Sequence, residues 1–345
     1  QGRKHAILFN SGGSANLALN QALKNIGKLR QGDNIGFSAL TWSTNVMPLI
    51  QQGFNVVPID CIKTTLNAHA DPTIEALEKN NCKAFFITNV VGLAGDLGKL
   101  KKLCKKKKII LIEDNCESLG TELHDGKTGN FGLASTFSFF VAHHMSTIEG
   151  GMAVTDNHAL AEMLKITRAN GWDRNIHPHR QKHLRKKHKV DDFYARYTFF
   201  DLGYNLRPTE ITGFLGKYQL PFLNKTINTR EKHFHMVQKI AKNNPDFIPL
   251  EYGHIKRISS FVLPFICKTK LIRDRYVIRF EKAGIETRPV IAGNIIRHPF
   301  YKKHVIKHYD LPESEFIHNC GFYCGNSPDY TDKDMRIIVD CIKTK

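Results

Sequence analysis

The chain has 345 residues, of which 41% are hydrophobic and 24% are charged. This length favours two domains over one, and the absence of any apolar run of 18 residues means that no membrane-spanning helix is expected. Eight irregularly spaced cysteines are typical of a reduced, cytoplasmic protein, and the pair Cys320 and Cys324 lacks the second pair that would complete a metal site.

Strand-like and helix-like segments alternate through the first half of the chain. Short apolar runs predict strands at 5–10, 34–40, 55–60, 84–89, 108–114, 134–142 and 150–155. Segments with helical apolar spacing separate the first five of these, at 14–27, 43–53, 73–80 and 97–107. The alternation predicts an α/β domain with a mostly parallel central sheet flanked by helices. Ligands of such sheets bind beyond the carboxyl ends of the strands.

The pattern changes after about residue 225. Helical spacing at 229–243, 273–284 and 329–342 is interrupted by apolar runs at 259–267 and 285–291 that read as strands. We therefore expect a large domain over 1–225 and a small C-terminal α+β domain over 226–345.

The formal net charge of +18 is concentrated in two segments, 101–108 and 177–190. Nucleic-acid binding is the first alternative that such charge suggests, but neither segment carries interleaved aromatic residues or a nucleic-acid fold signature. We expect the first segment to be the solvated end of a helix and the second to be a mobile basic loop. An anionic small substrate would also account for the second segment, so no nucleic-acid partner is expected.

Three residue groups follow predicted strands in chain order. The loop at 10–16 contains Gly13 and Ser14, which suit either a phosphate cradle at a helix start or a plain turn. Trp42 follows the second strand and suits either stacking on a cofactor ring or core packing. Asp114 ends the fifth strand and suits pairing with a protonated cofactor nitrogen, a helix cap or a surface ion pair.

In this order, these residues resemble the DegT/DnrJ/EryC1/StrS aminotransferase family of fold-type-I pyridoxal phosphate enzymes, over essentially the whole chain. The resemblance implies that fold and that cofactor. Family members usually carry a further segment before the first strand found here, so we expect an N-terminal segment to be missing.

In that family, a lysine six residues before Glu-Gly-Gly binds the cofactor covalently. Here Glu149 begins that motif, His143 stands six residues earlier, and no lysine occurs between Lys127 and Lys165. The sequences "EDNCES", "RANGWDRN", "GYNLRP" and "AGIETRPVIAGN" are similar to the pyridoxamine-dependent 3-dehydratases of nucleotide sugars. The branch of these enzymes with an iron–sulfur cluster needs a Cys-X-Cys element, which this chain lacks.

The resemblance implies roles for individual residues. His143 becomes the catalytic base, and non-covalent contacts to the cofactor come from Gly13, Ser14, Trp42, Asp114, Glu117, Ser138 and Asn205. Of these, Asn205 reaches the phosphate of the neighbouring subunit, so a homodimer with composite sites is expected. The binding of substrate anions is assigned to Arg174, Arg207 and Arg288, with surface charges as the less favoured alternative for the first two.

The implied reaction is removal of the hydroxyl at sugar carbon 3 from a nucleotide-linked 4-keto-6-deoxyhexose, with GDP-4-keto-6-deoxy-D-mannose as the expected substrate. Glutamate is the expected amino donor, and the pathway would be that of dideoxysugars in O-antigen or lipopolysaccharide. Two alternatives remain: a nucleotide-sugar 4-aminotransferase that works without its lysine, and a non-catalytic or nucleic-acid-binding relative.

Overall fold

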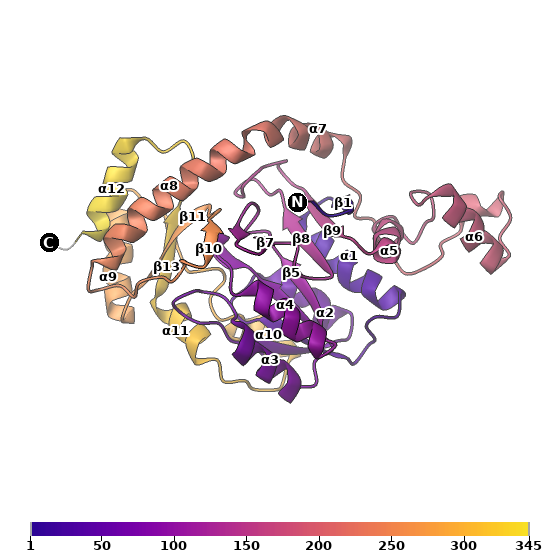
Figure 1. Ribbon diagram of the computed structural model, residues 1–345, viewed down its shortest axis with the longest axis horizontal. Helices are drawn as coiled ribbons and strands as arrows, with labels where there is room; N and C mark the ends of the chain where they lie inside the picture. Colours follow the sequence, from indigo (N-terminus) through magenta and orange to yellow (C-terminus); the bar gives the residue numbers. More distant parts are fainter. Residues whose placement is uncertain (1, 344–345) are drawn as a thin grey trace.

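The computed structural model describes residues 2–343. Its centre is a seven-stranded sheet with the strand order β1-β9-β8-β5-β4-β2-β3 (Figure 1). Strands β8, β5, β4, β2 and β3 run parallel, whereas β9 is antiparallel to both β8 and β1, so the predicted mostly parallel sheet is confirmed. The strands are β1 (His5–Phe9), β2 (Asn34–Ser38), β3 (Asn55–Ile59), β4 (Ala84–Thr88), β5 (Ile110–Asp114), β8 (Ala134–Ser138) and β9 (Gly151–Thr155).

Both faces of this sheet are buried under helices. In β4, Phe86 belongs to one buried cluster and Phe85 and Ile87 to another, because successive side chains of a strand point to opposite faces. The cluster around Phe86 includes side chains from α1 (Gly12–Asn25), α2 (Met47–Gln51), α5 (His158–Arg168) and α10 (Pro299–His304). The cluster around Phe85 includes side chains from α3 (Ala70–Lys79) and α4 (Leu97–Lys106). The continuous apolar runs of the strands therefore follow from burial on both sides.

The C-terminal part is built around an antiparallel sheet in the order β11-β13-β12. Its elements are β11 (Val262–Ile266), β12 (Thr287–Arg288), β13 (Gly321–Gly325), α8 (Leu223–Lys242), α9 (Lys270–Lys282), α11 (Pro312–Cys320) and α12 (Asp332–Ile342). Phe234 and Phe265 of this part share one buried cluster with Phe85 of the large sheet. The domain boundary at 225/226 stays a prediction, and helix α8 crosses it. Residues 1, 344 and 345, at the ends of the two expected domains, lie outside the described residues.

Three short strands, several 3₁₀ turns and helix α7 (Glu210–Gln219) also belong to the part of the chain that the structure describes. Strands β6 (Glu122–Leu123), β7 (Gly126–Lys127) and β10 (Ile255–Arg257) form a small sheet in the order β10-β6-β7. The turns are η1 (Ser43–Asn45), η2 (Val90–Gly92), η3 (Tyr194–Tyr197), η4 (Leu220–Phe222) and η5 (Ile295–Arg297).

Some predicted boundaries were wrong. The strand expected over 134–142 ends at Ser138, because the chain turns after Phe139, where His143 N–H donates to the carbonyl of Phe140 at 3.0 Å. The helix expected over 43–53 is divided into η1 and α2, with Pro48 in the first turn of α2. The strand expected over 285–291 is reduced to β12, two residues long.

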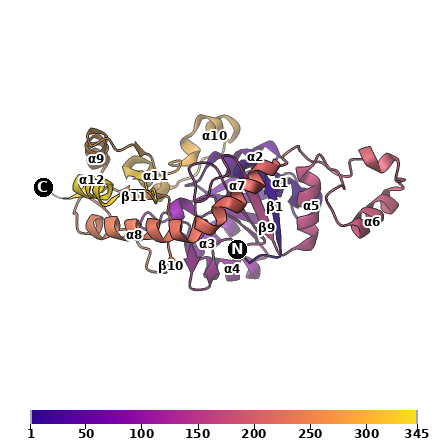
Figure 2. The ribbon, with the colours of Figure 1, turned by 90° about the horizontal axis from the view of Figure 1, so that it is seen from above.

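The basic segment 177–190 is helical rather than a loop, which corrects the sequence-based expectation. Helix α6 (Pro178–His188) begins after the cap His177, with proline in its first turn, and none of its residues is buried. Arg185 ties it to the body through the buried Asp173 at 2.8 Å. Both views show α6 standing apart from the rest of the molecule (Figures 1 and 2). The other basic segment lies, as expected, at the exposed end of α4.

No helix among residues 2–343 is long and apolar enough to cross a membrane. The eight cysteines all lie within the described residues and are unpaired thiols. Cys320 and Cys324 are buried, and no group of three or more metal-binding side chains occurs in the described part of the chain.

Candidate functional site

The candidate site lies where four strands of the large sheet end. The loop after β1, Trp42 after β2, Asp114 at the end of β5 and Ser138 at the end of β8 follow the carboxyl ends of their strands. Strands β5 and β8 are direct neighbours, with Asp114 opposite Thr136. The sheet thus brings to one edge residues that lie more than a hundred positions apart in the sequence.

The start of α1 is packed against two of these strand ends. A methyl group on Gly12 would lie 2.7 Å from Cβ of Ser138, and one on Gly13 would lie 2.9 Å from Cγ2 of Thr44. Ser11 caps the helix by accepting a hydrogen bond from the Ser14 N–H at 3.0 Å. The first turn carries no acidic residue, and its remaining N–H groups have no intrahelical partner. This helix start is therefore suited to an anion, and the structure brings Gly13, Ser14 and Ser138 together.

Asp114 is buried, with an exposed fraction of 3%. Asn16 and Asn45 donate their side-chain N–H groups to its Oδ2 at 2.9 and 2.7 Å, and Cys116 N–H donates to Oδ1 at 2.8 Å. These three donors fix the position of the carboxyl group. Asp114 is neither a helix cap nor a surface ion pair, the two alternatives that the sequence left open.

Trp42 lies at the same edge of the sheet. Its side chain is 54% exposed, so the core-packing alternative is wrong. Its carbonyl accepts a hydrogen bond from Asn45 N–H at 3.1 Å, which begins the turn η1. Trp42 therefore lies three positions before Asn45, whose side chain donates a hydrogen bond to Asp114.

Glu117 is buried close to Asp114 but binds the backbone of the chain. Its Oε2 accepts a hydrogen bond from Val91 N–H at 2.8 Å. Val91 has φ = 50°, an unusual conformation for a β-branched residue, and Glu117 therefore stabilises a strained turn. Burial raises the pKa of Glu117 to about 8, and the negative charge of Asp114 adds to the effect.

His143 lies in the irregular segment between β8 and β9. It is partly buried, and its ring meets the rings of Phe140 and Phe261 edge-on at centroid distances of 5.9 and 5.3 Å. Its Nδ1 is buried without a hydrogen-bond partner among the described residues. Burial lowers the pKa of His143 to about 4; the charge of Asp114 opposes this effect and the charge of Arg230 adds to it. At neutral pH the imidazole is therefore neutral and able to accept a proton.

His144 has a different environment from its neighbour. It is buried, and its Nε2 lies 2.7 Å from the carbonyl oxygen of Ser259, to which it donates a hydrogen bond. Burial lowers its pKa to about 3. His144 therefore ties the segment 139–149 to the segment before β11 through Nε2, although its Nδ1 is also unpartnered, whereas the ring of His143 makes no hydrogen bond with any described residue.

Arg230 of α8 contacts the backbone of His143, and its positive charge acts on both histidines. Its guanidinium is buried and donates to the carbonyl oxygens of Asn326, at 2.8 Å, and of His143, at 3.5 Å. No carboxylate forms an ion pair with it among the described residues, and burial lowers the pKa of Arg230 to about 10. The group remains charged at neutral pH, so it disfavours a second positive charge on His143.

Asn205 and Arg207 lie near the candidate helix start. The carbonyl between them, that of Leu206, accepts a hydrogen bond from the N–H of Asn10 at 3.1 Å. Both side chains are exposed in the single chain, and Arg207 Nε donates to Oδ1 of Asn205 at 3.1 Å. The role of Asn205 toward a neighbouring subunit stays a prediction.

Arg174 and Arg288 contact residues other than those that surround Asp114. The guanidinium of Arg174 stacks on the ring of Trp172 at 3.5 Å and donates to the carbonyl of Arg196 at 3.0 Å. Arg288 pairs with Glu286 at 2.8 Å and lines a cavity of about 410 Å³ that also includes Ala142, next to His143. The substrate contacts assigned to these arginines stay predictions.

Sequence reasoning missed the residues that support the predicted ones. Asn16 and Asn45 hold Asp114, and Arg230 lies behind His143. For Arg230 a signal existed: buried residues of α8 recur at the heptad-like positions 227, 230, 234, 237 and 241, so an arginine stands on the apolar face of the helix. For Asn16 the corresponding signal is a polar residue among the buried alanines and leucines of α1.

Known proteins are similar to this chain over nearly its whole length. GDP-4-keto-6-deoxy-D-mannose 3-dehydratase from Yersinia pseudotuberculosis is 33% identical over 99% of this chain and 87% of its own length. The protein of the same name from Escherichia coli O55:H7 is 35% identical over 94% and 84%.

Among solved structures, a GDP-4-keto-6-deoxymannose-3-dehydratase with a trapped pyridoxal phosphate–glutamate geminal diamine has a TM-score of 0.89. It is 31% identical and covers 99% of this chain and 89% of its own. The model of the DegT/DnrJ/EryC1/StrS aminotransferase family matches residues 1–343. The chain therefore belongs to the DegT/DnrJ/EryC1/StrS family.

Proposed function

We propose that the chain is a 3-dehydratase that removes the hydroxyl at carbon 3 of GDP-4-keto-6-deoxy-D-mannose, using pyridoxal phosphate and glutamate. The observation that carries the proposal is His143: a neutral, partly buried imidazole with an unpartnered nitrogen, in a stretch from residue 128 to 164 that has no lysine. Two relatives that match nearly the whole chain bear this name, which supports the choice of substrate.

The residues of the site suit pyridoxal phosphate. The first turn of α1 and the hydroxyl of Ser138 offer donors to a phosphate, and glycine at 12 and 13 leaves no side chain in the way. The exposed indole of Trp42 offers a face to the ring. Asp114, held in place by three donors, would accept a hydrogen bond from the protonated ring nitrogen.

Pyridoxal phosphate, when bound, supplies an electron sink and carries the amino group of glutamate to the keto group of the sugar. Asp114 favours the protonated ring, because a carboxylate stabilises a neighbouring positive charge. The overall balance is sugar plus glutamate giving the 3-deoxy sugar, 2-oxoglutarate and ammonia. The two electrons that replace oxygen by hydrogen at carbon 3 come from glutamate.

His143 would move the protons of this reaction. As a neutral imidazole it accepts a proton, and as the imidazolium so formed it can donate that proton to the departing hydroxyl, which leaves as water. A lysine at this position would bind the cofactor covalently and favour return of an amino sugar. Arg174, Arg207 and Arg288 would bind anionic groups of the substrate.

The proposed assembly is a homodimer with composite sites. Helix α7 (Glu210–Gln219) presents Ile211, Phe214 and Tyr218 on one stripe, each with about two thirds or more of its surface exposed: 65%, 71% and 67%. Leu220 and Phe222 continue the patch. A second copy of the chain would cover this apolar surface, and a symmetric dimer is the commonest way to do so. A cytoplasmic location accords with the eight unpaired thiols.

The proposal is tested by incubating the protein with pyridoxal phosphate, glutamate and a panel of GDP-, CDP- and dTDP-linked 4-keto-6-deoxyhexoses, followed by mass spectrometry. We expect loss of one oxygen from the GDP sugar. An amino sugar product would contradict the dehydratase reaction, and deoxygenation of only a CDP or dTDP sugar would contradict the choice of nucleotide.

A further inference from the structure

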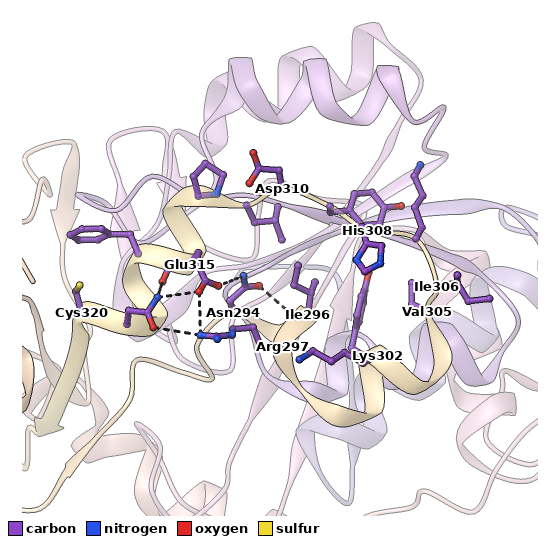
Figure 3. Close-up of a pocket in the computed structure, with 17 residues that line it drawn as sticks. Asn294, Ile296, Arg297, Lys302, Val305, Ile306, His308, Asp310, Glu315 and Cys320 are labelled. Carbon is purple, nitrogen blue, oxygen red and sulfur yellow. Dashed lines mark hydrogen bonds and ion pairs between the residues drawn. The ribbon is translucent and has the colours of Figure 1, made fainter. Parts of the chain in front are cut away.

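A cavity of about 960 Å³ lies apart from the candidate cofactor site, and none of the residues assigned to cofactor or substrate lines it (Figure 3). It is enclosed by η5, α10, the loop 305–311 and α11. The hydroxyl of Tyr309, in that loop, lies 3.4 Å from the carbonyl of Val56 in β3, which is the edge strand of the large sheet. The cavity is large enough for a small-molecule ligand.

The cavity is lined by more basic than acidic side chains: Arg297, Lys302 and Lys307 line it together with the carboxyl groups of Asp310 and Glu315. The segment 297–308 contains four lysines and arginines and three histidines but no acidic residue. Arg297 is neutralised by Glu315 at 3.1 Å. Lys302 and His308 line the cavity and are exposed, and their side chains make no hydrogen bond or ion pair with any described residue. Figure 3 shows Arg297 joined to Glu315 by dashed lines, while Lys302 and His308 have none.

The cavity contains a buried hydroxyl that has no partner. Tyr301 of α10 is only 3% exposed, it lines the cavity, and its hydroxyl makes no hydrogen bond within the described part of the chain. Buried polar groups in proteins nearly always have a partner, because an unpaired one loses its hydration without replacement. A polar atom of a ligand would provide the missing hydrogen bond.

The walls between the rim and Tyr301 are apolar and aromatic. They include Ile296, Leu311, Tyr309 and Phe316, and Lys307 lies over the ring of Tyr309 at 5.0 Å from its centroid. A ligand that uses all three features needs a flat apolar body, a polar edge for Tyr301 and a negative charge for the rim. Inorganic phosphate lacks the first, and an alkyl phosphate lacks the second.

We propose that this cavity is a second binding site of the protein and that its ligand is a nucleoside phosphate. The base lies against the aromatic wall with a polar edge at Tyr301, and the phosphates lie at Lys302 and His308. This proposal is independent of the reaction at His143, because no residue is shared between the two sites.

The test uses the full chain loaded with pyridoxal phosphate and a photoreactive azido-GDP as the probe. After irradiation and digestion, mass spectrometry should find label on a peptide from 294–320 in addition to any label near the candidate active site. Lys302→Glu and Tyr301→Phe should each reduce labelling of that peptide about tenfold. Lys303→Glu is the matched control, because Lys303 is an exposed neighbour that does not line the cavity.

Competition identifies the ligand chemistry. Unlabelled GDP should suppress labelling of the 294–320 peptide at concentrations at which inorganic phosphate and octyl phosphate do not. Labelling that is absent from this peptide, or unchanged in both variants, would overturn the proposal. Equal suppression by inorganic phosphate or octyl phosphate would overturn the assignment to a nucleoside phosphate. None of these outcomes depends on turnover, so failure of the proposed dehydratase activity would be seen separately.

Discussion

His144→Asn should lower the free energy of unfolding and leave catalysis intact. His143→Asn should lower kcat and leave the free energy of unfolding nearly unchanged. His144 is buried and donates to the carbonyl of Ser259, whereas the ring of His143 makes no hydrogen bond with any described residue. Two adjacent imidazoles thus serve different purposes, one in joining segments of the chain and one in moving protons.

The magnitudes follow from these contacts. His144→Asn leaves the carbonyl of Ser259 without its donor inside the protein, which costs about 1–3 kcal/mol. It also loses the edge-on contact with Phe261 at 5.4 Å, worth roughly 1 kcal/mol, so the free energy of unfolding should fall by about 2–4 kcal/mol. His143→Asn should reduce kcat by about a hundred- to ten-thousandfold, the usual contribution of a general acid–base group.

The pKa of His144 adds a second signature. Because the folded protein holds this pKa at about 3, the unfolded chain takes up a proton first as the pH falls below about 6.5, and wild-type stability declines over that range. His144→Asn removes this group, so its stability should decline less steeply with falling pH.

Urea unfolding between pH 4 and 8 and turnover per folded molecule test both variants. If folded His144→Asn protein is inactive while His143→Asn protein turns over normally, the base has been placed on the wrong histidine.

Three further predictions concern the same site. His143→Lys should bind the cofactor covalently, so that borohydride fixes it at residue 143 in the variant but leaves it removable from the wild type; removable cofactor in the reduced variant would contradict the placement of His143. Arg230→Met removes a buried positive charge beside His143, which raises the pKa of that imidazole, so the acid limb of the pH–kcat profile should move to higher pH; an unmoved limb would show that the charge of Arg230 is not felt there. Phe214→Glu places a charge in the exposed apolar stripe of α7 and should shift the protein toward monomers in analytical ultracentrifugation and lower activity; a fully active monomer would contradict the composite site.

The sequence was sufficient to predict elements with long, regular patterns. The strands of the large sheet alternate with helices, and apolar runs such as 84–89 predicted β4 because it is buried on both faces. Irregular segments were predicted less well: the run 134–142 was predicted as one strand, but its last residues leave the sheet, and Val141 is 62% exposed. In this segment, apolar residues occur both in the strand and in the exposed part after it, so composition alone does not show where the strand ends.

The residues of the site could be proposed from motifs, but their supports could not. Asp114 was predicted from its place at a strand end, whereas Asn45 binds it from 69 positions away and Arg230 contacts His143 from 87 positions away. Such contacts depend on how elements distant in sequence pack together, which local spacing does not encode. The helix α6 was missed because its five lysines and arginines and three histidines leave no apolar face, so it has no amphipathic pattern to detect.

The fate of the glutamate nitrogen tests the central claim most directly. Wild-type protein would be supplied with pyridoxal phosphate, ¹⁵N-glutamate and GDP-4-keto-6-deoxy-D-mannose, and the label would be followed by mass spectrometry and NMR. We predict that each 3-deoxy sugar formed is accompanied by one ¹⁵N-ammonia and one 2-oxoglutarate, with no label in the sugar. Recovery of the ¹⁵N in an amino sugar, with oxygen retained at carbon 3, would show that the protein is an aminotransferase and would contradict the account.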